Sequence, residues 1–187
     1  MSLRRGFRAE ANWYAREMRR ELNLADYGPI CPWKLADHLG FPVVPLTEFK
    51  ETAAANAVDY LGSAGGRREF SAVTLFSGSA RIIIHNDTHD PKRQAANIAH
   101  ELAHGLLLHP PKPPFDAAGS RHYDKDREDE ANWLGPALLV SDEAAMHIAR
   151  RRMTLDAASD QYGASEDLVR MRLNVSGAYI RVRRRVA

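Results

Sequence analysis

The chain has 187 residues, 44% of them hydrophobic, which is enough to bury the core of one compact domain or of a domain with a small appendage. Its formal net charge of +2 is too close to zero to indicate nucleic-acid binding by itself. No apolar run approaches the length of a membrane-spanning helix, and the first residues lack the hydrophobic segment of a signal peptide. The single cysteine, Cys31, excludes an internal disulfide, and we expect a cytoplasmic protein with no membrane partner.

The amino-terminal part alternates helix and strand signals. Residues 7–23 carry one apolar stripe at helical spacing, and residues 32–39 predict a short helix that Gly40 ends. Residues 41–46 read as a strand, and the two prolines in it favour an edge position. Residues 50–66 are rich in alanine and glycine, and the pattern there predicts no element.

A β-hairpin is predicted next. Residues 70–76 and 80–85 are strand-like, and the Ser-Gly-Ser sequence at 77–79 is typical of the turn between them. The second strand leads into a helix that begins at Asp90 and Pro91. Since an extended peptide can add to an exposed sheet edge, we expect one strand of this hairpin to be such an edge.

The helix that follows carries the sharpest motif of the chain, His-Glu-Leu-Ala-His at 100–104. Histidines four residues apart lie on one face of a helix, where both rings can bind one metal ion. Glu101, beside them, could take a proton from a water molecule at that metal. The alternative is a charged helix with two surface histidines, but the apolar residues fall on the opposite side of this helix, which favours the metal site.

A third ligand is expected downstream, where residues 124–130 hold five acidic side chains. They could simply favour the start of a helix through its dipole. On a helical wheel, however, Glu130 lies in the middle of the buried face, where a carboxylate needs compensation, and Glu128 points away. We therefore expect Glu130 as the ligand, with Asp126 as the second candidate or as a hydrogen-bond partner of a histidine. Pro136 should kink or break this helix.

These motifs resemble the ImmA/IrrE family of metallopeptidases. The resemblance is carried by residues 100–109, His-Glu-Leu-Ala-His-Gly-Leu-Leu-Leu-His, and by residues 130–141, Glu-Ala-Asn-Trp-Leu-Gly-Pro-Ala-Leu-Leu-Val-Ser. It implies metal ligands at His100, His104 and Glu130, and Glu101 as the general base. It also implies an intracellular peptidase that cleaves a helix-turn-helix transcriptional repressor. The departures are Ala103, Leu134, Gly135-Pro136 and Val140-Ser141, and none of them is a ligand.

The carboxyl-terminal segment resembles a helix-turn-helix. Residues 155–162 and 165–175 are helical in pattern and are separated by Gly163-Ala164. A recognition helix presents its first turn to DNA, but here that turn carries Glu166 and Asp167, which favours a packed helical hairpin. The arginines after residue 180 form a basic tail that is most simply solvated.

We therefore expect an α+β fold, in which a small zincin-like sheet packs on the metal-binding helix. Residues 1–150 would form the metallopeptidase domain, and residues 151–187 the helix-turn-helix-like segment with its basic tail. The leading hypothesis is a zinc-dependent endopeptidase, with manganese as the alternative metal. His122 or Tyr123 could stabilise the oxyanion. The competing hypothesis is a metal-containing DNA-binding regulator, or a toxin–antitoxin component, without proteolytic turnover.

Overall fold

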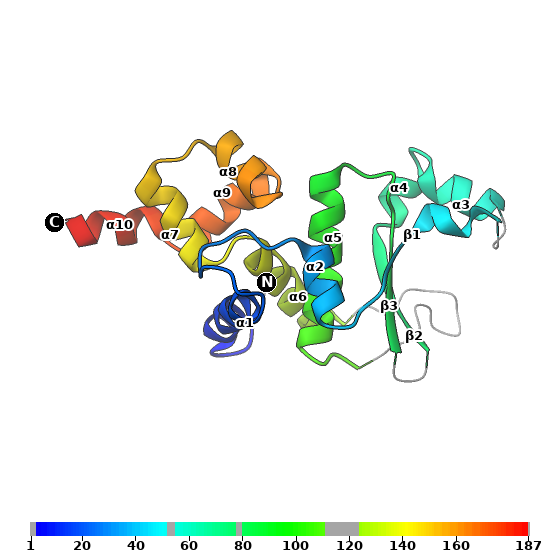
Figure 1. Cartoon of the computed structure of the whole chain (residues 1–187), viewed down its shortest axis with the longest axis horizontal. Coiled ribbons are helices and arrows are strands. Elements are labelled where there is room, and N and C mark those ends of the chain that lie inside the picture. The colour runs from blue at the N-terminus through cyan, green and yellow to red at the C-terminus, as the bar shows by residue number, and fades with distance from the viewer. Residues whose placement is uncertain (1–2, 52–54, 78–79, 111–123, 187) are drawn as a thin grey trace.

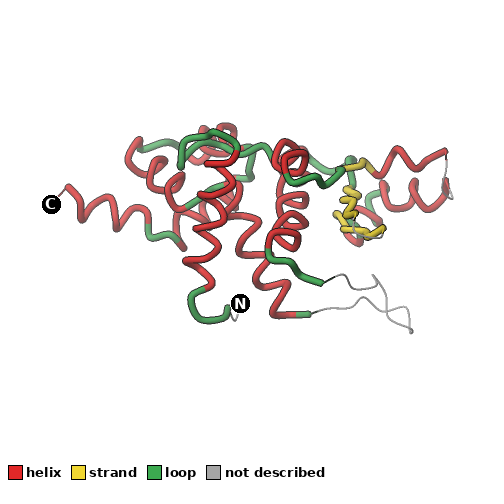
Figure 2. The backbone as a smooth tube through the Cα atoms, turned by 60° about the horizontal axis from the view of Figure 1, so that its bottom comes forward, coloured by secondary structure: helices red, strands yellow, loops and turns green. Residues whose placement is uncertain are grey.

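The computed structural model describes residues 3–51, 55–77, 80–110 and 124–186. Helices predominate in these residues, and three strands form one small sheet (Figures 1 and 2). In chain order the elements are α1 (Phe7–Glu21), α2 (Pro32–His38), β1 (Val43–Pro45), the 3-10 helix η1 (Leu46–Glu51), α3 (Ala55–Gly62), α4 (Gly66–Glu69), β2 (Ala72–Ser77), β3 (Ala80–His85), α5 (Pro91–Leu106), α6 (Lys125–Leu139), α7 (Asp142–Arg151), α8 (Leu155–Tyr162), α9 (Glu166–Val175) and α10 (Ala178–Val186).

The sheet confirms the predicted hairpin and the predicted edge strand. Its order is β1-β3-β2, with β1 parallel and β2 antiparallel to the central strand β3. Ile83 of β3 pairs with Val43 on one side and with Thr74 on the other. Within the described part of the chain, β1 and β2 are therefore the two edges of the sheet.

Helix α5 lies in the middle of the molecule, between the sheet on one side and helices α1 and α6 to α10 on the other (Figure 1). Its apolar side packs into a core to which α1, α2, β3 and α6 also contribute. Representative members of this core, all fully buried, are Phe7, Leu35, Ile83, Ile98, Leu102 and Leu134. The fold is thus of the predicted mixed α+β kind, with a small sheet beside a largely helical body.

The carboxyl-terminal helices α7 to α10 form a second hydrophobic cluster on the far side of α5 and α6 from the sheet (Figure 1). Helices α8 and α9 occupy the predicted ranges, with Gly163 at φ 59° between them and the Ser165 side chain accepting a hydrogen bond from the Leu168 amide. The basic tail is helical as α10. The domain division at residue 150 and a helix-turn-helix function of this segment stay predictions. No described helix has both the length and the apolar character needed to cross a bilayer.

Helix α6 is continuous through Pro136, so the expected break does not occur. Two buried arginines hold its carboxyl end. Arg19 of α1 donates to the carbonyls of Leu138 and Leu139, and Arg172 of α9 donates to the carbonyl of Val140. Cations are favoured at this end of a helix, where carbonyl groups lack intrahelical partners. The two arginines thereby fix the position of α6 against its neighbours.

Candidate metal centre

Helix α5 presents the two motif histidines on its polar side. The helix begins with the predicted cap, since the Asp90 side chain accepts a hydrogen bond from the Lys92 amide at 2.9 Å and Pro91 occupies the first turn. Its apolar side is fully buried, whereas the side chains of His100 and His104 retain 25% and 20% exposure. Burial of one side therefore fixes the direction in which both rings point.

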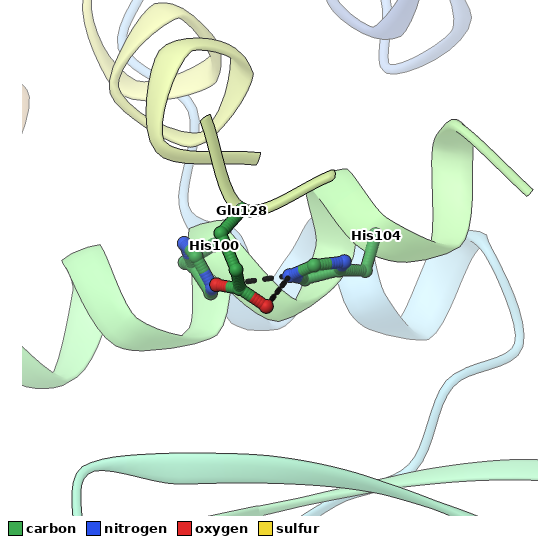
Figure 3. Close-up of side chains that lie close together, drawn as sticks. All are labelled: His100, His104 and Glu128. Atoms are coloured by element: carbon green, nitrogen blue, oxygen red, sulfur yellow. Dashed lines mark hydrogen bonds and ion pairs between the residues drawn. The ribbon is translucent and has the colours of Figure 1, made fainter. Parts of the chain in front are cut away.

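The two rings meet the carboxylate of Glu128, which comes from the first turns of α6 (Figure 3). The Nε2 atoms of His100 and His104 lie 3.1 Å apart, and they lie 3.4 and 3.5 Å from the Glu128 carboxylate oxygens. One ligand atom from each of the three residues lies within 4.8 Å of the others.

This geometry fits a divalent metal ion. Ligand atoms about 2.05 Å from a tetrahedral zinc ion lie about 3.3 Å from one another, close to the three separations observed. Two imidazoles and one carboxylate also form the donor set typical of a catalytic zinc site, which leaves one position open. The residues present therefore fit such an ion.

The electrostatics of the three side chains favour a positive charge between them. Hydrogen bonds from His100 and His104 hold the pKa of Glu128 far below its ordinary value, so its carboxylate stays ionised. Burial lowers the pKa of His100, but the hydrogen bond to Glu128 and the charge of Glu101 outweigh burial and raise that pKa above its usual value. The ionised carboxylate of Glu128 would likewise stabilise a cation bound between the two rings.

The predicted ligand Glu130 lies elsewhere in the structure. One of its carboxylate oxygens is 2.7 Å from Arg4 Nε, and the other is 3.3 Å from His109 Nε2. Among the described residues, Glu130 does not belong to the group that could hold a metal, and Asp126 is exposed and does not belong to it either. Glu128, and not Glu130, is therefore the candidate third ligand.

The difference arises because α6 packs on two neighbours. Glu130 is turned toward α1, whereas Glu128 is turned toward α5. A helical wheel identifies the buried side of a helix but not which neighbour covers each part of it. The sequence of α6 contains one indication of the face that meets α5, the glycine at position 135. A Cβ atom there would lie 3.0 Å from His100 Cα, so α5 and α6 approach each other closely at this residue. Glu128 is two turns before Gly135 and therefore lies on the same face.

Glu101 faces the sheet rather than α6. The Thr74 hydroxyl of β2 donates a hydrogen bond to its Oε2 at 2.6 Å. The carboxylate opens into a cleft of about 1110 Å³ between β2 on one side and α5 with the start of α6 on the other. His100, His104, Glu101 and Glu128 all line this cleft.

Three of the other histidines, His85, His89 and His109, lie at or just beyond the ends of β3 and α5. His85 and His89 lie at the end of β3 and in the following turn, outside the metal-ligand group, and His89 Nε2 lies 3.0 Å from the carbonyl of Arg67. His109 contacts His104 and Glu130. His122 and Tyr123, the expected oxyanion donors, lie outside the described residues.

The comparison with protein families agrees with this arrangement. Residues 60–174, more than half of the chain, match the peptidase family described as the IrrE N-terminal-like domain. The match contains β2, β3, α5 and α6, and hence every residue of the candidate site. Searches of curated proteins and of solved structures gave no significant match. The chain belongs to the IrrE N-terminal-like family of metallopeptidases, as the two motifs had indicated.

Proposed function

We propose that the protein is a zinc-dependent endopeptidase in which His100, His104 and Glu128 hold the metal. The observation that carries this proposal is the convergence of these three side chains beside Glu101 at the floor of one cleft. The donor set favours zinc, with manganese as the alternative because a carboxylate is present. When bound, zinc would polarise the scissile carbonyl and lower the pKa of the attacking water.

Glu101 would act as the general base. Its carboxylate accepts the proton of the attacking water and delivers it to the nitrogen of the departing amine. The hydrogen bond from Thr74 occupies Oε2 and leaves Oε1 available for that proton. Thr74 thereby fixes the carboxylate from the sheet side of the cleft that the histidines also line.

The substrate would be an extended protein segment. Such a segment could add to the open edge of β2, which runs along the cleft, through main-chain hydrogen bonds. Leu75 and Phe76 of this strand line the cleft and are 38% and 37% exposed, so they could receive apolar substrate side chains. By family resemblance we propose a helix-turn-helix repressor as the substrate, cleaved in an exposed segment, and a cytoplasmic location.

The competing hypothesis of a DNA-binding regulator without turnover has less support. The exposed first turn of α9 is acidic, and Arg170 pairs with Asp167 at 2.7 Å and with Glu166 at 4.0 Å. This arginine is therefore partly neutralised by its own helix. Retention of a carboxylate base beside the ligands also favours catalysis, because a structural metal needs none.

The test is to incubate the zinc-loaded protein with the repressor encoded beside its gene and to identify cleavage products by mass spectrometry. The matched control is Glu101→Gln, which keeps the size of the side chain but cannot accept the proton. It should retain about one zinc per chain and lose about 10²–10⁴-fold in rate. Cleavage by Glu101→Gln at the wild-type rate would refute Glu101 as the base. A wild-type protein that binds no zinc would refute the metal site.

A further inference from the structure

A chain of polar contacts leads from His104 away from the metal centre to the amino terminus. His104 Nδ1 lies 2.8 Å from His109 Nδ1, and His109 Nε2 lies 3.3 Å from Glu130 Oε2. The other oxygen of Glu130 accepts a hydrogen bond from Arg4 Nε at 2.7 Å. The side chains of His109 and Glu130 are only 11% and 14% exposed, so the contact between these two is largely protected from water.

With a metal ion on His104 Nε2, the contacts can all be satisfied in one donor order only. If His104 offers its Nε2 lone pair to a metal, its Nδ1 carries the hydrogen and donates. His109 Nδ1 must then accept, so the hydrogen of His109 resides on Nε2. That hydrogen points at Glu130, which as a carboxylate can only accept. A metal ion on His104 and the carboxylate of Glu130 therefore require the same tautomers, with hydrogen on Nδ1 of His104 and on Nε2 of His109.

The backbone at the end of α5 serves this arrangement. Leu108 has φ 53°, in the left-handed region that residues with a side chain rarely adopt, and its side chain is 77% exposed. Burial of Leu108 therefore does not explain the turn. The His109 amide donates to the carbonyl of His104 at 3.0 Å, which brings the His109 ring back beside that of His104.

We propose that His109 and Glu130 are positioning residues that fix the tautomer and the ring orientation of His104, so that its Nε2 is directed at the metal. Histidine ligands generally donate their other ring hydrogen to a carboxylate or carbonyl group, which orients the ring. Here a second histidine relays that contact to Glu130. This inference rests on the proposed function in one respect, namely that the site holds a divalent ion.

The variants are His109→Leu and His109→Gln. Leucine cannot hydrogen-bond, whereas the glutamine amide can accept from His104 with its oxygen and donate to Glu130 with its nitrogen. The matched control makes the same two changes at His38, which pairs with Glu21 at 2.7 Å on the surface, remote from the site. Loss of a partner behind a metal ligand typically weakens metal binding about 10–100-fold.

The dissociation constant of zinc is measured by competition with a chromophoric chelator, together with the unfolding temperature of each metal-free protein. We expect His109→Leu to bind zinc about 10–100-fold more weakly, His109→Gln to recover most of the affinity, and both His38 variants to match wild type. In the zinc-loaded wild type, nitrogen-15 NMR should show a slowly exchanging hydrogen on Nδ1 of His104, and His109→Leu should make that exchange faster.

Unchanged zinc affinity in His109→Leu would overturn the inference. The inference would also be overturned if His109→Leu and His109→Gln lost equal zinc affinity and both metal-free variants unfolded at a lower temperature. That result would indicate a merely structural role for His109. These outcomes are distinct from failure of the proposed function. That failure would appear as a wild-type protein that binds no zinc, or that binds zinc and cleaves nothing.

Discussion

Replacing Glu128 and Glu130 in parallel by glutamine tests the metal centre most directly. Each change removes one charge and keeps the size of the side chain. The two residues lie two positions apart at the start of α6, about half a helical turn, yet Glu128 meets the histidine rings whereas Glu130 meets His109 and Arg4. The two variants should therefore differ strongly in metal affinity although their effects on helix propensity are the same.

The magnitudes follow from the contacts. Four-ligand zinc sites bind with about 10–16 kcal/mol, or about 3 kcal/mol per ligand, and an amide is a poor zinc ligand. Glu128→Gln should thus weaken zinc binding about 100-fold or more, since about 1.4 kcal/mol corresponds to tenfold. Glu130→Gln can keep an acceptor oxygen for His109 but loses the charge and the hydrogen bond from Arg4. Because the contact to His109 remains, we expect a loss in zinc affinity of about 1 kcal/mol, the worth of one hydrogen bond, or about fivefold.

The assay is zinc competition against a chromophoric chelator at constant pH and ionic strength, with zinc stoichiometry from elemental analysis. Unfolding temperatures of the metal-free variants serve as the control for folding. A larger loss of affinity in Glu130→Gln than in Glu128→Gln would refute the reasoning. That result would return the third-ligand role to Glu130.

Three further predictions concern the surroundings of the site. Thr74→Val removes the hydroxyl that orients Glu101. It should lower kcat about tenfold, the worth of one hydrogen bond to a charged group, and leave zinc affinity unchanged; an unaltered kcat would contradict this role. Gly135→Ala places a Cβ atom 3.0 Å from the His100 backbone, so chemical denaturation should show a loss of about 1–3 kcal/mol in stability, and a neutral effect would count against close packing of α5 and α6. Zinc at about 100 times its dissociation constant should stabilise the fold by about 2.7 kcal/mol and raise Tm by about 5–10 °C, which chelation should reverse; a Tm indifferent to zinc would argue against the site.

The parts of the fold that depend on local sequence were predictable. The cap at Asp90, the spacing of His100 and His104 and the apolar back of α5 all act within one helix, and each is found in the structure. The β2–β3 hairpin was predictable for the same reason, because strand alternation and turn residues lie side by side in the chain.

The parts that depend on the pairing of distant elements were not predictable. Whether Glu128 or Glu130 meets the histidines depends on how α6 is rotated between α1 and α5, which Arg19 and Arg172 help to set from other helices. The hydrophobic periodicity of α6 does not contain this information, and within α6 the glycine at position 135 is the indication of the face that meets α5. The continuity of α6 through Pro136 has a similar origin, because tertiary contacts at its carboxyl end hold a helix that local propensity alone would interrupt.

The arrangement divides the proposed chemistry between two parts of the fold. Helices α5 and α6 present the proposed metal ligands, and their relative position is fixed by core packing and by buried arginines. The proposed base is instead oriented from the sheet, through the hydroxyl of Thr74 on β2. Within the described residues, the same strand is the edge of the sheet that runs along the cleft. A peptide that pairs with β2 would therefore be aligned by the strand that also orients Glu101. One element would then set both the position of the scissile bond and the direction of the carboxylate that takes the proton of the attacking water.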